Sequence, residues 1–288
     1  MCDGVTMEGK VCLVTGSNTG IGEVTARELA GRGAKVWMAC RNEGRAREAM
    51  ARIRAVHPEA DLRFLALDLG DLDAVRNAAD AFLESESRLD VLIDNAGLAG
   101  QKGVTAQGFE LTFGVNHLGH FLLTEQLRPL LTETGTESEP ARVVIVASRA
   151  HTRLRKRFDW AALRQPTRSI SGFHEYKVSK LANVLHAKAL ARRLEGEPVT
   201  VYALHPGVVA SDVWRKVPWP FRSLIKLFMV TNEEGAQTTL HCATSPEVKH
   251  ESGRYYADCA PKTASAFARD EALQEELWRR SEAWVARS

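Results

Sequence analysis

The chain is expected to adopt an α/β fold, a single doubly wound parallel sheet with helices on both faces. Three observations predict it. Short apolar runs alternate with amphipathic segments along the sequence, a glycine-rich turn follows the first apolar run, and each polar motif falls at the end of an apolar run or on the segment just after it. Strands that alternate with helices indicate a parallel sheet covered on both faces.

The elements follow from these patterns in order. Apolar runs of strand length predict strands over residues 11–15, 35–40, 62–67, 89–93, 142–147 and 200–204. The intervening segments predict helices over residues 22–31, up to about 57, and over 72–83, 113–131 and 175–194, before a closing C-terminal strand and helix. Right-handed crossovers between such strands place the ligand crevice at their carboxyl ends.

Length and composition favour one soluble domain over residues 1–288, with a variable segment at about 211–231. Hydrophobic residues form 44% of the chain and charged residues 26%, so disorder is not expected. The formal net charge of +2 is too small to indicate nucleic acid as the main partner. The longest apolar stretches have the length of a strand, and residues 1–10 do not have the pattern of a signal peptide or membrane anchor.

Cysteine and histidine spacing argue against structural disulfides and metal sites. The five cysteines are scattered and none forms a C-x-x-C pair, which is typical of free thiols in a reducing compartment. The nine histidines include no H-E-x-x-H spacing, so no metal is expected. We therefore expect a cytoplasmic location.

The glycine-rich turn predicts a phosphate site. It joins the first strand to the first helix, where free backbone N–H groups and the helix dipole favour a pyrophosphate. Its glycines allow the backbone to approach a ligand without a Cβ clash. The expected cofactor contacts here are Gly16, Ser17, Asn18, Thr19, Gly20, Ile21 and Gly22.

A second motif supplies acid–base chemistry. Tyr176 and Lys180 lie four residues apart, so on a helix the phenol and the ammonium share a face. A fixed positive charge favours phenolate, and we expect it to lower the pKa of Tyr176 from about 10. The pair would give and take a proton beside the ligand held by the glycine turn.

The Gly-x-x-x-Gly-x-Gly spacing, together with Tyr-x-x-x-Lys, makes the chain resemble the short-chain dehydrogenase/reductase family over nearly its whole length. The resemblance implies a Rossmann domain and a catalytic set of Asn116, Ser148, Tyr176 and Lys180. It implies that Tyr176 is the general acid in carbonyl reduction and that Ser148 binds the substrate oxygen. In relatives, the asparagine interrupts its helix and helps to hold a water of the proton relay.

The end of the second strand bears on coenzyme choice. An acidic residue there would accept from the ribose 2′-hydroxyl of NAD, but this chain has Cys40 and Arg41. Arg41 suits a 2′-phosphate, so we expect NADP (NADPH) rather than NAD. Alternatively, Arg41 is a solvated residue at a helix start.

Further cofactor contacts are implied by the resemblance. Asp68 and Leu69 match the family position that contacts adenine, although Asp68 could instead cap the next helix. Asp-Asn-Ala-Gly matches the family's Asn-Asn-Ala-Gly except at its first position. This motif implies cofactor contacts at Asn95, Ala96 and Gly97. The Pro-Gly turn after the sixth strand implies further contacts at Pro206, Gly207, Val208 and Ser211, although it could also be a turn that binds no ligand.

Three stretches, at residues 116–124, 177–185 and 205–209, resemble the retinol dehydrogenase branch more specifically. That implies an apolar aldehyde or ketone substrate such as retinal. The segment over residues 213–230 is rich in apolar residues and leaves three interpretations open: a substrate lid, a helix packed on the core, or a peripheral membrane contact. Dimers and tetramers built on the catalytic helix are common in the family, so the resemblance implies a homodimer or homotetramer.

Two other functions are alternatives to hydride transfer. Nucleotide-sugar epimerases also use Tyr-x-x-x-Lys, but their glycine spacing is usually Gly-x-x-Gly-x-x-Gly and their substrate domain is larger. An NADP-binding sensor or scaffold without turnover has no need of Tyr176. The sequence therefore favours an NADP-dependent oxidoreductase that interconverts carbonyl and alcohol groups.

Overall fold

The computed structural model describes residues 5–207 and 231–286. One sheet of eight strands has the order β3-β2-β1-β4-β5-β6-β7-β8, parallel throughout except for the β7–β8 pair. The strands are β1 Val11–Thr15, β2 Lys35–Cys40, β3 Leu62–Ala66, β4 Val91–Asp94, β5 Ala141–Val146, β6 Val199–His205, β7 Arg254–Ala257 and β8 Ala260–Lys262. The predicted doubly wound parallel sheet is confirmed.

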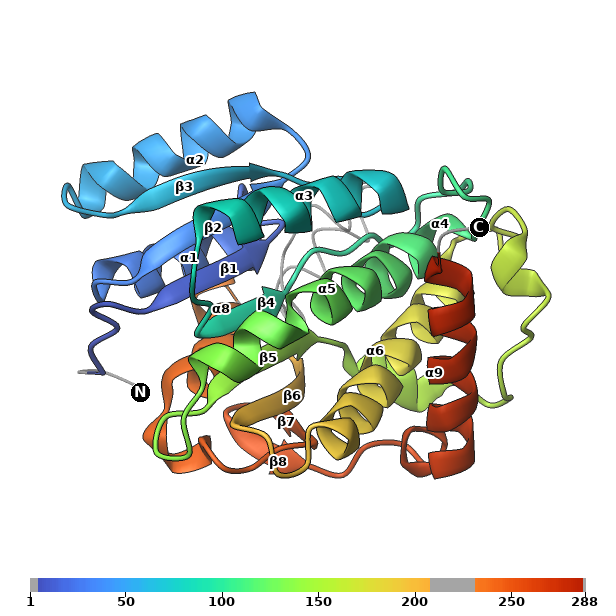
Figure 1. Ribbon diagram of the computed structural model, residues 1–288. Coiled ribbons are helices and arrows are strands. Elements are labelled where there is room, and N and C mark those ends of the chain that lie inside the picture. Colours follow the sequence, from blue (N-terminus) through green and yellow to red (C-terminus); the bar gives the residue numbers. More distant parts are fainter. Residues whose placement is uncertain (1–4, 208–230, 287–288) are drawn as a thin grey trace.

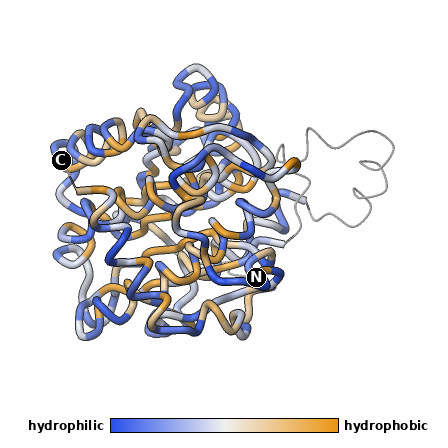
Figure 2. The backbone as a smooth tube through the Cα atoms, turned by 90° about the vertical axis from the view of Figure 1, so that its right-hand side faces the viewer, coloured by the Kyte–Doolittle hydropathy of each residue, from blue (hydrophilic) through white to orange (hydrophobic). Residues whose placement is uncertain are grey.

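Helices cover both faces of this sheet (Figure 1). They are α1 Gly20–Gly31, α2 Glu43–Val56, α3 Leu72–Ser85, α4 Leu111–Phe113, α5 Gly119–Thr134, α6 Phe173–Arg193, α8 Asn232–Thr244 and α9 Glu271–Val285. Two hydrophobic clusters fill the two interfaces. One lies under α1, α2 and α8, and the other lies under α3, α5, α6 and α9. Figure 2 shows the apolar segments running through the centre of the molecule.

Polar side chains define where several helices begin. Asn42 accepts from the Arg45 N–H at the start of α2, and Asp270 accepts from the Leu273 N–H at the start of α9. Thr231 forms a capping box with Glu234 at the start of α8. Each bond satisfies a backbone donor that has no partner inside the helix.

The expected C-terminal strand is the first half of a hairpin. β7 extends the parallel sheet, and β8 turns back along it in the antiparallel direction. Asp258 and Cys259 between them have φ of 54° and 55°. Two consecutive residues with positive φ are typical of the tight turn that matches the twist of a hairpin.

Two sequence expectations are testable on the described residues. Cys12 and Cys40 are buried free thiols, as expected. Among residues 5–207 and 231–286, no helix is both long enough and apolar enough to cross a membrane. The segment expected to be variable lies outside the described residues, except for Thr231.

Candidate active site

The predicted site residues converge at the carboxyl ends of the parallel strands. Gly16 follows β1, Asn95 follows β4, and Ser148 lies two residues beyond β5. Helix α6 carries Tyr176 and Lys180 along the same edge. Its start is fixed by close backbone packing, because a Cβ on Gly172, whose φ is +66°, would lie 2.9 Å from the Gly100 Cα.

The glycine turn is packed too tightly for any side chain at two positions. A Cβ on Gly22 would lie 2.5 Å from both the Gly16 carbonyl oxygen and Asn95 Nδ2, and a Cβ on Gly16 would lie 2.9 Å from the Ala96 Cα. At the N-cap of α1, the Thr19 side chain makes no capping bond, so it leaves the first backbone N–H groups of the helix to a ligand. The turn therefore has the form of a phosphate cradle.

The side chains of Ser17 and Cys40 face inward. The Ser17 hydroxyl donates to the Val14 carbonyl at 3.0 Å and lies 3.5 Å from Cys40 Sγ. Ser17 can therefore meet a ligand only through its backbone. Arg41 is exposed at the end of β2, next to the turn, where its guanidinium is accessible to a charged ligand group.

A hydrogen-bond network joins the ends of β1 and β4 to the helix behind them. Thr15 Oγ1 accepts from the Asn95 and Ala96 N–H groups at 2.9 and 3.0 Å. It donates to His120 Nε2 at 2.8 Å, because His120 Nδ1–H is donated to the Asn116 carbonyl at 3.1 Å. Burial lowers the pKa of His120 to about 4, so the ring is neutral and keeps this tautomer. Asn95 Nδ2 donates to the Thr15 carbonyl at 2.8 Å, so its amide shapes the glycine turn.

Asp68 does not cap the helix that follows it. Its Oδ1 accepts from the Gly70 N–H at 2.9 Å, while Asp71 caps α3 by accepting from the Asp73 N–H at 3.0 Å. The capping alternative for Asp68 is therefore wrong, and its predicted adenine contact stays a prediction. Leu69 is buried in the core, so only its backbone can contribute to a ligand site.

Asn116 lies in a π-helical turn, Gly114–Leu118, between α4 and α5. The expected helix interruption is therefore present, and such π turns are frequent at functional sites. The Asn116 side chain is fully buried, accepts from the Leu98 N–H at 2.7 Å and donates to the Leu98 carbonyl at 3.0 Å. It also donates to Ser179 Oγ at 3.0 Å, which connects the turn to α6.

The Ser148 side chain lies beside the Tyr176 phenol, close enough to oppose part of the rise in the pKa of Tyr176. Ser148 Oγ accepts from the Ala150 N–H at 3.2 Å, so its own proton is free to be donated. Lys180 Nζ lies 5.8 Å from the centre of the Tyr176 ring and donates to the Val146 carbonyl at 2.7 Å. A Cβ on Gly97 would lie 3.5 Å from both Lys180 Nζ and Asn116 Oδ1, so all four predicted groups border one small region.

The electrostatics of this pair differ from the expectation. Burial raises the pKa of Tyr176, and the Ser148 hydrogen bond offsets this only in part. Burial also lowers the pKa of Lys180 to about 8. The expected lowering of the Tyr176 pKa by the ammonium is therefore wrong for this structure: the low dielectric disfavours the charged form of both side chains.

Comparisons with known proteins agree with this geometry. The family model of the short chain dehydrogenases matches residues 10–159. The chain belongs to this family. It is 44% identical to retinol dehydrogenase 12 of Mus musculus over 95% of this chain and 85% of that protein, and 41% identical to human retinol dehydrogenase 14 over 97% and 87%. This short-chain dehydrogenase is therefore retinol dehydrogenase-like.

Solved structures show the same fold. An uncharacterised protein from Mycobacterium paratuberculosis superimposes with a TM-score of 0.78 at 32% identity and covers 98% of this short-chain dehydrogenase and 96% of that chain. Pseudomonas aeruginosa RhlG, solved with NADP, has a TM-score of 0.70 at 26% identity over 88% and 96%. The family binds nicotinamide cofactors, and the turn around Gly16 and Gly22 fits the diphosphate of such a group because no Cβ fits there.

Sequence reasoning missed several polar groups beside the site. His205 ends β6 and is 5% exposed, and neither of its ring nitrogens has a hydrogen-bond partner among the described residues. Burial and the nearby Arg149, His151 and Lys180 lower the pKa of His205 to about 4, although Asp258 opposes the shift. Tyr255 of β7 lies on the same face of the sheet as His205, and its hydroxyl also has no hydrogen-bond partner among the described residues. The only sequence signal was the position of His205 immediately before the Pro-Gly turn.

Asp94, the departure from the family motif, is fully buried at the end of β4. Thr124 Oγ1 donates to its Oδ2 at 2.9 Å, whereas its Oδ1 has no partner. Burial raises the pKa of Asp94 to about 8, and the Thr124 bond opposes the shift only in part. The carboxyl is therefore mainly protonated at neutral pH and is not a counter-ion for the site.

Pro206 and Gly207 follow β6 as predicted, but Val208 and Ser211 lie outside the described residues.

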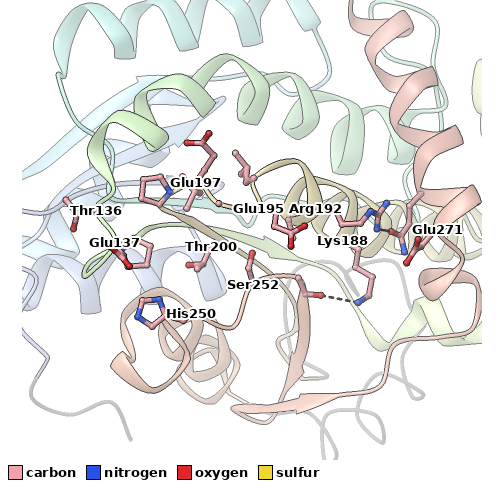
Figure 3. Close-up of a pocket in the computed structure, with 18 of the residues that line it drawn as sticks. Thr136, Glu137, Lys188, Arg192, Glu195, Glu197, Thr200, His250, Ser252 and Glu271 are labelled. Atoms are coloured by element: carbon pink, nitrogen blue, oxygen red, sulfur yellow. Dashed lines mark hydrogen bonds between the residues drawn. The ribbon is translucent and has the colours of Figure 1, made fainter.

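A cavity of about 1010 Å³ lies away from the predicted catalytic side chains, at the end of the sheet where the strands begin (Figure 3). It is lined by the end of α6 and the starts of β6 and α9, and Lys188 there donates to the Gly253 carbonyl at 3.0 Å. The cavity contains none of the predicted site residues.

Proposed function

We propose that this short-chain dehydrogenase is an NADP-dependent reductase of lipophilic aldehydes or ketones such as retinal. The observation that carries the proposal is the shared region bordered by Ser148, Tyr176, Lys180 and Asn116. The nicotinamide, when bound, supplies the hydride. The protein supplies orientation, a proton and a polar environment for the developing oxyanion.

Each side chain has a distinct part in this proposal. Ser148 Oγ is held by the Ala150 N–H, and its hydroxyl would donate to the substrate oxygen. Tyr176 would deliver the proton to the same oxygen, and its raised pKa keeps it protonated for this step. The Lys180 ammonium would compensate the phenolate that remains. Asn116, with its side chain fixed by Leu98, would hold the water that resupplies the proton.

The preference for NADP rests on Arg41. Its side chain is exposed at the end of β2, and the neighbouring Cys40 is buried against Ser17 and offers no carboxylate to a ribose hydroxyl. Charge-assisted bonds to a 2′-phosphate are worth roughly 1.5–3 kcal/mol. RhlG and a short chain dehydrogenase from Burkholderia cenocepacia, 25% identical, were both solved with NADP, which supports this choice.

The substrate class rests on similarity to retinol dehydrogenases 12, 14 and 11, the last 42% identical in its human form. The test is NADPH oxidation with retinal, medium-chain aldehydes and quinones by the parent chain and by Tyr176→Phe. We expect turnover on at least one apolar carbonyl and a loss of roughly 100-fold or more in the variant. Cofactor binding without turnover on any carbonyl would favour the sensor alternative instead. The related dehydrogenases weigh against the epimerase alternative.

Coenzyme choice is tested by Arg41→Asp. We expect the KM of NADPH to rise roughly 10- to 100-fold while that of NADH changes little, since only NADPH has the 2′-phosphate. An equal change for both coenzymes would show that Arg41 does not read this group.

We propose that self-association, expected as a homodimer or homotetramer, does not use the face of α6 that α9 covers. In Figure 1 the two helices lie side by side. Leu273, Leu277 and Trp278 of α9 are at most 4% exposed, and much of α6 is buried within the one chain. Light scattering after gel filtration measures the molar mass of the particle in solution and so the number of chains in it.

The cytoplasmic location, the peripheral membrane contact and the single domain over residues 1–288 stay predictions.

A further inference from the structure

His151 lies three residues after Ser148, in the short 3-10 helix Arg149–Arg153. Its side chain is fully buried, although Arg149 and Thr152 of the same short helix are exposed. His151 Nδ1 lies 2.7 Å from the Ser148 carbonyl oxygen, and Nε2 lies 3.2 Å from the Ser265 backbone nitrogen. Both ring nitrogens are therefore engaged by backbone groups.

These two partners determine the state of the ring. The Ser148 carbonyl can only accept, so Nδ1 carries the proton and donates it. The Ser265 N–H can only donate, so Nε2 carries the lone pair. Only the neutral Nδ1–H tautomer satisfies both bonds. Burial lowers the pKa of His151, while the Ser148 carbonyl opposes this shift, and the net lowering agrees with a neutral ring.

The ring is also packed in a defined orientation. It meets Tyr255 of β7 edge to face, with ring centres 4.9 Å apart and an interplanar angle of 70°. Ser265 lies between β8 and α9, and its Oγ accepts from the Ala268 N–H at 3.3 Å. His151 thus connects the loop that carries Ser148 to the chain segment that leads into α9.

We propose that His151 is a positioning residue for the carbonyl-reducing reaction: it holds the Ser148 backbone so that the Ser148 hydroxyl stays beside the Tyr176 phenol. The Ser148 carbonyl accepts both the Nδ1–H and the His151 backbone N–H, the latter at 3.2 Å. The Ser148 hydroxyl is held separately, by the Ala150 N–H at 3.2 Å. Without the ring donor, the start of this 3-10 turn loses its shortest bond. A displacement of about 1 Å at a reacting group can lower the rate roughly 100-fold.

The inference rests on the proposed function and is tested by a series at one position. His151→Phe keeps a ring but removes both polar atoms. His151→Asn places an amide N–H near the position of Nδ1 and restores the donor to Ser148. His186→Phe is the control, because His186 is also buried, on α6, and packs against Phe121 and Trp278 away from the Ser148 loop. For each variant, kcat and the KM of NADPH and of the carbonyl substrate are measured, together with thermal stability.

We expect His151→Phe to lower kcat roughly 10- to 100-fold with the KM of NADPH nearly unchanged, and His151→Asn to recover most of the rate. We expect His186→Phe to leave kcat close to that of the parent. If His151→Phe does not fold, His151→Gln replaces it, since its amide reaches the Nε2 position rather than that of Nδ1.

Three results would overturn the inference: a parent-like kcat in His151→Phe, an equal loss of kcat in His151→Asn, or an equal loss in His186→Phe. The last would show that kcat follows general destabilisation. A parent chain without turnover on any carbonyl refutes the proposed function itself, and that outcome is separate from these three.

Discussion

Replacing Asp94 by asparagine is expected to stabilise this short-chain dehydrogenase at neutral pH. Asp94 is fully buried, and only one of its two carboxyl oxygens has a hydrogen-bond partner, Thr124 Oγ1 at 2.9 Å. An asparagine oxygen can accept the same bond, and the side chain keeps its shape. The substitution removes the titratable group, but it places an amide NH2 at the Oδ1 position, which has no partner among the described residues, and this adds a pH-independent cost of about 1–3 kcal/mol.

The magnitude follows from the pKa of this carboxyl. Burial raises it from 3.8 to about 8, so between these values the folded state binds a proton that the unfolded state has released. Stability then falls as the pH rises, by about 1.4 kcal/mol per pH unit. At pH 7 the cost of Asp94 amounts to roughly 4 kcal/mol, and it disappears below the unfolded pKa of about 4. The stability advantage of Asp94→Asn should therefore grow by roughly 3 kcal/mol between about pH 5 and pH 7.

The assay is urea unfolding of both proteins at about pH 5, 6 and 7, with ΔG extrapolated to water. Asp90→Asn is the matched control. Burial alone would raise the pKa of Asp90, but hydrogen bonds from the Arg88 guanidinium at 2.7 Å and from the Val11 N–H at 2.9 Å outweigh burial and lower it. Its ionised form stabilises the fold, so this control should be destabilised at pH 7 and recover as the pH falls. A pH-independent difference for Asp94→Asn, or destabilisation that increases toward pH 7, would refute the reasoning.

Three further expectations concern the glycine turn, Lys180 and α9. Gly22→Ala should weaken NADPH binding, measured by titration, at least tenfold, because the new Cβ would lie 2.5 Å from the Gly16 carbonyl oxygen. The control is Gly44→Ala, at an exposed position in a helix, which should leave NADPH binding unchanged. Since burial lowers the pKa of Lys180 to about 8, kcat/KM for carbonyl reduction should fall as the pH rises through about 8; a decline first seen near 10 would contradict this. Trp278→Ala should cost about 3–5 kcal/mol in urea unfolding, because its buried ring packs on Phe121 at 4.9 Å; a loss below about 1 kcal/mol would contradict this packing argument.

Local spacing explains why the fold, the glycine turn and the Tyr176–Lys180 pair could be predicted. The alternation of apolar runs and helices needs only neighbouring residues, and so do the glycine turn and the four-residue step from Tyr176 to Lys180. The contacts that hold the site join distant segments and have no local signature. Thr15 meets His120 across 105 residues, and His151 meets Ser265 across 114. The wrong direction for the Tyr176 pKa has the same origin, because burial cannot be read from the spacing of two residues.

The network around the site separates chemistry from support. Two buried histidines each donate Nδ1–H to the backbone carbonyl of a predicted catalytic residue: His120 to Asn116 and His151 to Ser148. Burial lowers the pKa of both, so each is neutral and can accept a second bond through Nε2. A protonated ring would lose that acceptor, and at His120 it would also place a second cation near Lys180. Neutral histidines therefore leave the Lys180 ammonium, 5.8 Å from the centre of the Tyr176 ring, as the cation beside the phenol.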